Sequence, residues 1–273
     1  MAVGSLGPVR FFNDFTFMLD SMVPAATGEN LGGGVGLVGV NEGVLDTTND
    51  ESGGVLDITT DTGDNDNQVL VSGVFVPSEG GMWMEARFKI TDSVAATRAA
   101  VFCGFTETLS DTTPVMPFER ATATNDFNGS GDAGALIGMA FDSDSTILEF
   151  FAVAGNDAAG IACVDANGAA VANGVQQVTG SGVGSFNGTI LTADRWYIVR
   201  VEINASRIGR VYFGDYDGGA SLTVPLREVL RTTTLMEDVV YHAVLMIENR
   251  SAANERLEVD YFMGEGGRNW AAN

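Results

Sequence analysis

Alternation of apolar and polar residues with a period of two constrains this chain more than any other feature. Residues 82–90 (MWMEARFKI) show it most clearly: every second side chain, from Met84 to Ile90, is apolar. Successive side chains of a β-strand point to opposite faces, so this pattern predicts a half-buried strand. The intervening residues, which we expect on the other face, are Trp83, Glu85, Arg87 and Lys89.

The same alternation recurs along the chain, whereas helical patterning is almost absent. The longer strands that it predicts are 196–203, with Tyr197 on the core side, 241–247 and 257–263; shorter ones are expected at 55–59, 69–74, 100–105, 136–141, 147–153 and 210–213. A single helical turn is expected at Pro225–Leu230, where proline stands first. Many short strands separated by turn residues predict an all-β antiparallel sandwich or barrel.

Domain organisation follows from the spacing of these segments. No repeat of 20–50 residues is visible, which argues against a propeller or solenoid. We therefore expect a flexible N-terminal arm over 1–10 and one domain over 11–273. Two polar stretches, 106–132 and 154–190, are rich in Gly, Asn, Thr and Asp and are predicted to be long surface loops.

Charge excludes several classes of partner. The chain has 14 Lys and Arg against 36 Asp and Glu, a net charge of −22. Nucleic acid and anionic membranes bind clustered cations, so neither is an expected partner. No apolar run is long enough to cross a bilayer and Met1–Pro8 does not resemble a signal peptide, so we expect synthesis in the cytoplasm of a host.

The cysteines and the single lysine carry little functional signal. Cys103 and Cys163 stand in unrelated contexts without metal-ligand spacing, which predicts two free, buried thiols. Lys89 is the only lysine among the 14 cations. Arginine suits paired, desolvated contacts better than lysine does, so this preference hints at contact surfaces.

The order of the strand segments resembles a known fold family. A Phe-rich start leads to "GVLDIT", "MWMEARFKI" and "VFCGFTE"; "IGMAFDSDSTILEF", "DRWYIVRVEI", "GRVYFGDYDG" and "LEVDYF" follow. Over about residues 11–265 the series is similar to the concanavalin A-like jelly roll of laminin-G domains, legume lectins and glucanases. More narrowly, it resembles the bacteriophage structural proteins of that fold, which decorate or cement capsid shells.

The resemblance implies a non-enzymatic virion protein with long surface loops. On this hypothesis the chain lies on the capsid surface, stabilises it by bridging neighbouring major capsid subunits, and forms a homo-oligomer, most simply a trimer. An acidic surface would keep such an outer layer soluble. The residues expected to contact the shell are those of the arm, Val3, Leu6, Pro8 and Arg10.

A carbohydrate-binding module of a phage head or tail is the alternative hypothesis, since relatives of this fold bind glycans. Aromatic platforms with polar neighbours suit sugar stacking. The candidate glycan-binding residues are Trp83, Glu85, Arg87 and Trp196, with Tyr216 and Trp270 as further aromatic candidates.

A divergent or inactive glycoside hydrolase is the third hypothesis. Retaining glycosidases of this fold carry Glu-x-Asp-x-Glu or Glu-x-Asp-x-x-Glu on a mid-chain strand, with the two carboxyl groups ~5–5.5 Å apart. The nearest match is Glu258-Val259-Asp260, but its next acid is Glu265 and it lies on the last strand. We therefore expect no catalytic residues, and expect Glu258 and Asp260 to pair with Arg200, Arg87 or Lys89 instead.

Two further features have ordinary structural explanations. His242, the only histidine, alternates with Tyr241 and Ala243 in an apolar segment and is expected to be satisfied by its neighbours. The run 32–36 (GGGVG) lacks the Gly-Lys-Ser/Thr and the helix of a phosphate-binding loop, so we interpret it as flexible backbone.

Calcium is the one cofactor left open. Acidic turns occur at Asp61/Asp64/Asp66, Asp142/Asp144 and Asp215/Asp217. Oxygen-rich turns suit Ca²⁺, but Asp and Asn are also ordinary turn formers and no EF-hand loop is complete. We expect no metal site, and no cofactor unless one of these turns holds calcium.

Overall fold

The protein consists of two large antiparallel β-sheets and one short hairpin. In the computed structural model the described residues are 9–13, 29–32, 35–39, 44–48, 54–90, 98–107, 109, 114–127, 134–145, 149–157, 159–178, 195–216 and 222–267. They contain two single 3-10 turns, η1 (Pro77–Glu79) and η3 (Ala172–Gly174). No helix in this part of the chain is long and apolar enough to cross a membrane.

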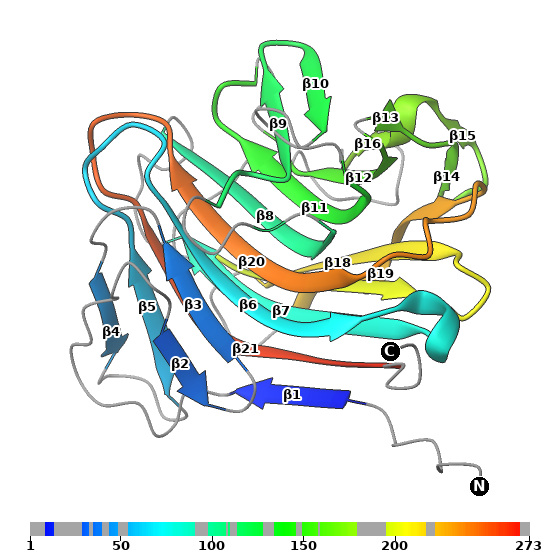
Figure 1. Ribbon diagram of the computed structural model, residues 1–273. Coiled ribbons are helices and arrows are strands. Elements are labelled where there is room, and N and C mark those ends of the chain that lie inside the picture. The colour runs from blue at the N-terminus through cyan, green and yellow to red at the C-terminus, as the bar shows by residue number, and fades with distance from the viewer. Residues whose placement is uncertain are drawn as a thin grey trace, which may run out of the picture.

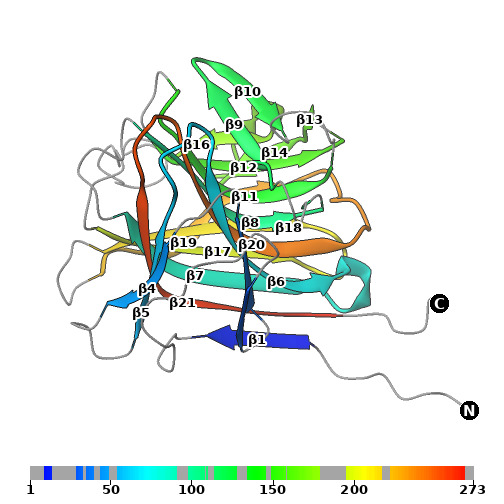
Figure 2. The ribbon, with the colours of Figure 1, turned by 60° about the vertical axis from the view of Figure 1, so that its left-hand side comes forward.

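The first sheet, sheet A, has ten strands. In spatial order they are β15 (Ala170–Val171), β14 (Cys163–Asp165), β19 (Leu222–Thr232), β18 (Gly209–Tyr216), β17 (Trp196–Ile203), β7 (Met82–Ile90), β21 (Arg256–Gly266), β5 (Val55–Thr59) and β4 (Val44–Thr48), with β1 (Val9–Asn13) also paired to β21. Figure 2 shows β1 alongside β21 at the bottom of the molecule.

The second sheet, sheet B, has nine strands. In spatial order they are β13 (Ala159–Gly160), β12 (Phe151–Asn156), β11 (Leu136–Asp142), β8 (Ala99–Thr106), β20 (Tyr241–Asn249), β6 (Asn67–Phe75), β3 (Val35–Gly39) and β2 (Glu29–Gly32), with β16 (Val175–Gln177) paired to β12. The hairpin of β9 (Phe118–Ala121) and β10 (Thr124–Phe127) lies over sheet B on the side away from sheet A (Figure 1).

The core lies between the inner faces of the two sheets. Strand β7 shows the alternation that the sequence predicts, because Met84, Ala86, Phe88 and Ile90 are all fully buried in this core. Aromatic rings pack between the two sheets. The ring centroid of Phe150 lies 4.9 Å from that of Tyr197 and 5.1 Å from that of Phe213. The protein is thus an all-β, two-sheet jelly-roll sandwich of the concanavalin A-like type, as expected.

The predicted helical turn at Pro225–Leu230 is wrong. These residues belong to β19, and Val229 and Leu230 are buried in the core. Pro225 is tolerated because it falls at an irregularity in the pairing of β18 with β19, between the pairs Phe213–Arg227 and Asp215–Val224. There no ladder hydrogen bond requires its missing N–H.

The two predicted long loops also contain regular structure. The stretch 106–132 includes β9 and β10, and 154–190 includes β13, β14, β15 and β16. These strands have only two to four residues, too few for a readable alternation. Within the predicted strand at 147–153, strand structure begins at Phe151, whereas 147 and 148 lie outside the described residues.

The predicted N-terminal arm, residues 1–10, overlaps a strand at its end. Val9 and Arg10 already belong to β1, where Arg10 is opposite Glu265 of β21. The other expected contact residues, Val3, Leu6 and Pro8, lie outside the described residues.

Candidate functional site

The outer face of sheet B is the first place where a ligand site could lie, because the long strands of this sheet curve toward that side in Figure 1. We call this concave side of the sheet the hollow of sheet B. Alternation directs Val244 and Met246 of β20, and Leu136 and Ala140 of β11, toward this face. The face is therefore apolar along its centre. Only Asp142 and Glu248, near the ends of their strands, add carboxylates to these two rows.

Residues 114–127, which we call the strap, cover this apolar face. Met116, Phe118 and Phe127 are buried in a second hydrophobic cluster that includes Phe102 of β8 and Phe151 of β12. Phe118 and Phe127, opposite each other in the hairpin, lie edge to face with centroids 5.3 Å apart. The strap thus fills the hollow of sheet B with the chain's own side chains.

Polar contacts fix the strap at intervals along its length. The Asn67 side-chain amide donates to the carbonyl of Pro114 at 2.7 Å, and the backbone N–H of Arg120 donates to Asp142 Oδ2 at 2.8 Å. The Thr122 N–H donates to the carbonyl of Asp144 at 2.8 Å. These bonds bind the strap to two segments of the sandwich, the start of β6 and the end of β11 with the turn that follows it.

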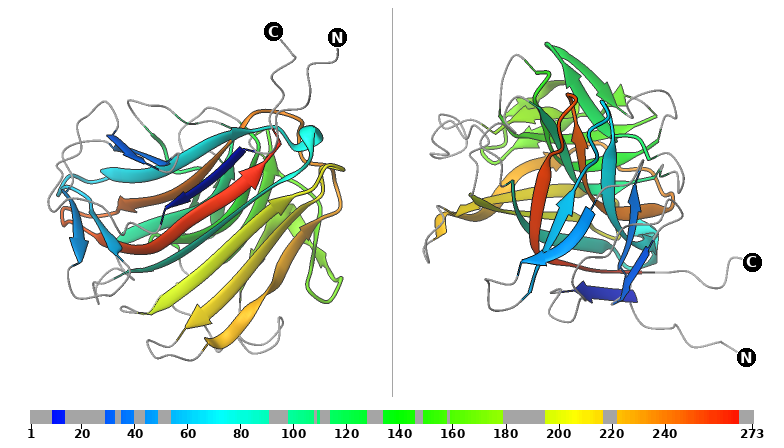
Figure 3. Two further views of the ribbon diagram at one scale, coloured as in Figure 1. Left: turned by 90° about the horizontal axis from the view of Figure 1, so that it is seen from below. Right: turned by 90° about the vertical axis from the view of Figure 1, so that its left-hand side faces the viewer.

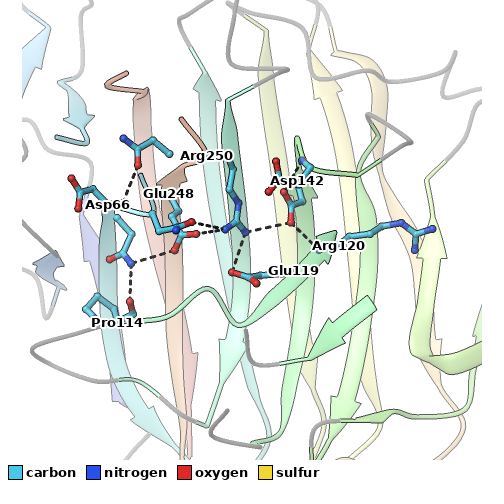
Figure 4. Close-up of polar contacts among 11 residues, drawn as sticks. Asp66, Pro114, Glu119, Arg120, Asp142, Glu248 and Arg250 are labelled. Atoms are coloured by element: carbon cyan, nitrogen blue, oxygen red, sulfur yellow. Dashed lines mark hydrogen bonds and ion pairs between the residues drawn. The ribbon is translucent and has the colours of Figure 1, made fainter. Parts of the chain in front are cut away.

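A buried arginine joins the strap to the sheet (Figure 4). Arg250 Nη1 lies 2.6 Å from Glu248 Oε1, while Nη2 lies 3.1 Å from Glu119 Oε1 of the strap and 3.3 Å from Asp142 Oδ2. The register explains this arrangement, because Ala100 of β8 is opposite both Glu248 and Asp142. A small residue between the two acids leaves room for the guanidinium.

Burial and neighbouring charges together set the pKa values of the Arg250 cluster. Burial comes first for Glu248. It raises the pKa of Glu248 to about 7; Arg250 opposes this shift, whereas Glu119 and Asp142 reinforce it. Burial acts to lower the pKa of Arg250, but the three carboxylates outweigh it, so this pKa is raised. One guanidinium is shared by three acids, and the cluster acts as a tie between strap and sheet.

The outer face of sheet A holds the predicted glycan-binding residues. Trp83, Glu85 and Arg87 project there from β7, and Trp196 from the adjacent β17. Trp196 is only 6% exposed, with Arg87 Cζ 4.5 Å and Lys89 Nζ 4.9 Å from its ring centroid. Trp83 is half-buried, and Arg200 Cζ lies 4.6 Å from its ring centroid.

The carboxylates of the closest glycosidase-like motif lie on the same face and are ion-paired. Glu258 Oε2 is 2.7 Å from Lys89 Nζ, and Asp260 Oδ2 is 2.6 Å from Arg87 Nη1. Both pairings were expected from the sequence. Arg200, the third candidate partner, pairs instead with Glu85 at 3.6 Å and Glu202 at 2.7 Å.

The acidic turns are engaged by protein groups where the structure describes them. Asp66 Oδ2 accepts the N–H of Gly63 at 2.8 Å, and Asp142 Oδ1 accepts the N–H of Asp144 at 3.0 Å. Among the described residues, no three His, Cys, Asp or Glu side chains gather as a metal site would require. The side chain of Asp215 and all of Asp217 lie outside the described part. The expectation of no metal site, with calcium at one of these turns as the open alternative, stays a prediction.

His242 and the two cysteines lie in buried or half-buried strand positions, which are typical of residues with a structural role. His242 is half-buried on β20, and burial lowers its pKa, an effect that a backbone hydrogen bond with Gly73 opposes. Cys103 and Cys163 are free and buried, as predicted. Burial raises the pKa of the Cys163 thiol to about 12, which makes it a poor nucleophile.

The strap and the Arg250 cluster could not be found in the sequence. The only signal is the apolar run Val115–Phe118 within an otherwise polar stretch. The cluster joins residues from three separate segments, so no local spacing reveals it. Of the four predicted contact residues of the arm, the described part of the chain includes Arg10, whose Nε lies 2.8 Å from Glu265 Oε2.

Comparison with known proteins defines the class of fold and no more. No protein-family model and no curated protein matches the chain. A protein of unknown function from Shewanella oneidensis MR-1 superposes with a TM-score of 0.55 at 14% identity, over 95% of this chain and 87% of that one. Peanut lectin gives a TM-score of 0.48 at 10% identity, over 97% of this chain and 100% of the lectin. The likeness to the Shewanella protein, at 14% identity, shows a shared fold, and a shared fold does not establish an activity.

Proposed function

We propose that this chain is a non-catalytic structural protein that decorates a phage capsid and stabilises it by bridging neighbouring major capsid subunits. The observation that carries the proposal is the strap, because it occupies the hollow of sheet B with the chain's own residues. Because the strap already covers this concave face, we infer that the protein works by binding partners through its other, exposed surfaces. The virion setting comes from the resemblance of the strand order to phage structural proteins.

The charge arrangement supports a docking protein over a hydrolase. The two acids of the glycosidase-like motif are each held by a cation, and their strand faces away from the hollow of the sandwich. An acid–base pair must flank its substrate with one group free to donate a proton and the other to attack. Paired in this way, Glu258 and Asp260 stabilise neighbouring strands.

The experiment that tests this proposal is quantitative mass spectrometry of purified particles of the virus that encodes the chain. We expect the chain in a fixed ratio to the major capsid protein, and particles that lack it to lose infectivity at lower temperature. Absence from purified particles, or unchanged heat resistance without it, would contradict the proposal.

Carbohydrate binding is the second candidate, and Trp83 is the observation that favours it. Its indole is half-buried on the outer face of sheet A, between Glu265 of β21 and Glu202 of β17 in the strand register. A glycan array with the full chain tests this function. Binding that is lost in Trp83→Ala would support it, and an array without hits would reject it.

A further inference from the structure

Two arginines on the outer face of sheet A lie directly opposite each other. Arg210 of β18 and Arg231 of β19 are partners in the strand register, and Figure 3 (left) shows these neighbouring strands from below in yellow and orange. Like charges directly opposite each other in an antiparallel pair destabilise a sheet. In a chain with only 14 cations, this placement calls for anionic groups that compensate both charges.

An irregularity in β19 gathers these charges on one face. The register of β18 with β19 shifts at Val229, between the pairs that Glu228 and Leu230 form, and Val229 and Leu230 are both buried in the core. In a regular strand Glu228 and Arg231 would point to opposite faces, because they are three residues apart. The β-bulge brings both onto the outer face.

Glu228 compensates only one of the two arginines. Its Oε2 lies 3.4 Å from Arg210 Nε and its Oε1 lies 3.7 Å from Arg231 Nε. Both distances exceed the ~2.7–2.9 Å of a charge-assisted hydrogen bond. Glu202, opposite Arg210 on β17, pairs instead with Arg200 at 2.7 Å. Among the described residues, two guanidiniums therefore share one carboxylate, with one positive charge in excess.

The arginine pair is accessible to solvent. The side chains of Arg210 and Arg231 are 36% and 42% exposed, whereas that of Arg250 is 6% exposed and contacts three carboxylates. A guanidinium has five N–H donors in a planar fork that fits a carboxylate. The pair thus has both the charge and the donors to hold a further anion, and Arg250 does not.

We propose that Arg210 and Arg231 form a binding site for a carboxylate, supplied by an acidic side chain of a protein partner. One carboxylate brings the site to two anions for two cations, whereas a phosphate group carries about −1.5 to −2 and would exceed the balance. Nucleic acid is disfavoured further, because a chain of net charge −22 repels polyanions.

A side chain on a partner surface suits this site better than a free carboxylate does. Two exposed guanidiniums hold a single small anion weakly, but the same contact adds to the others of a docked protein. The identification of that partner as a major capsid subunit rests on the proposed function. The site itself is argued from the isolated chain and does not depend on it.

Titration of the full-length chain with acetate tests the site, followed by NMR of the arginine Nε–Hε signals. Sodium acetate replaces sodium chloride at constant ionic strength and neutral pH. We expect saturable shifts for Arg210 and Arg231, whose signals Arg210→Gln and Arg231→Gln assign, and loss of these shifts in either variant. Arg200 is the matched control and should not respond, because it already pairs with Glu85 and Glu202.

Glu228→Gln separates binding from a structural role of the pair. This variant removes the competing carboxylate, so it should bind acetate about threefold or more tightly. Weaker or unchanged acetate binding in Glu228→Gln would overturn the proposal, and so would unsaturable shifts or an equal response of Arg200. Circular dichroism and thermal melting check that all variants fold.

A parallel titration with inorganic phosphate tests the class of anion. We expect phosphate to bind no more tightly than acetate; phosphate binding about tenfold tighter would overturn the carboxylate assignment. These titrations need no virus particles. Acetate binding by a chain that is absent from purified particles would support the site and contradict the capsid as the source of the carboxylate.

Discussion

At the scale of single residues, the Arg250 cluster is where this fold depends most on charge. The Arg250 side chain is 6% exposed and contacts three carboxylates from β20, β11 and the strap. Removing one partner from a buried ionic cluster leaves charges that neither protein nor water compensates. The cluster therefore stabilises the fold only when all four of its charged groups are present. Its contribution to the free energy of unfolding is not the sum of the separate ion pairs.

Replacing Arg250 with methionine tests this dependence. The variant keeps a long apolar stem but leaves Glu248, Asp142 and Glu119 without their cation, and we expect a loss of about 3–5 kcal/mol in the free energy of unfolding. Arg231→Met is the control, because Arg231 is 42% exposed and lies 3.7 Å from Glu228; its cost should stay within about 1 kcal/mol. Urea denaturation measures both, and equal losses would contradict the assignment.

Glu248 predicts a specific pH dependence. Its pKa is about 7 in the folded chain, against an ordinary value of 4.5 for a glutamate, so between these values the folded state binds more protons than the unfolded state. This group's contribution to stability is therefore complete below about pH 4.5 and is lost as the pH rises through 7. In Glu248→Gln the contribution is absent.

Urea denaturation at a series of pH values, wild type against Glu248→Gln, measures this effect. The difference in unfolding free energy between the two proteins should shift in favour of Glu248→Gln as the pH rises, and level off above 7. A difference that is independent of pH, or that changes in the opposite direction, would show that Glu248 titrates normally.

At the scale of elements, the long strands were predictable and the strap was not. The segments at 82–90 and 196–203 alternate over eight or nine residues, so their two faces can be assigned from the sequence alone. Strands β9 and β10 have four residues each, and their position depends on contacts with β8, β11 and β12. Tertiary packing fixes the position of such short strands. The local sequence pattern does not encode that packing.

The same limit applies to the candidate site. The sequence predicted which side chains of β7 face away from the core, and hence that Trp83, Glu85 and Arg87 share a face. It could not predict that β17 would place Arg200 over Trp83, or that Lys89 and Arg87 would lie over Trp196, because the register between strands is set by the whole sheet.

Phe118→Ala tests whether the strap is part of the cooperative fold. Phe118 is 1% exposed and packs between the hairpin and sheet B. Its truncation should therefore lower the free energy of unfolding by about 3–5 kcal/mol. Val115→Ala, at a side chain 42% exposed on the same strap, should change stability by no more than about 0.5 kcal/mol. Urea denaturation measures both variants. Equal free energies of unfolding would contradict this prediction and show that the strap is not part of the cooperative fold.

At the scale of the whole molecule, the central claim is that the hollow of this sandwich is filled by its own strap. The proposal that the protein acts by docking rests on this claim. Hydrogen exchange of the native chain, with and without a panel of oligosaccharides, tests the claim most directly. We predict that the paired amides of β9 and β10 exchange as slowly as those of β8 and β11, and that no sugar changes them. A strap that exchanges freely, together with a sugar that protects the strands beneath it, would contradict the claim.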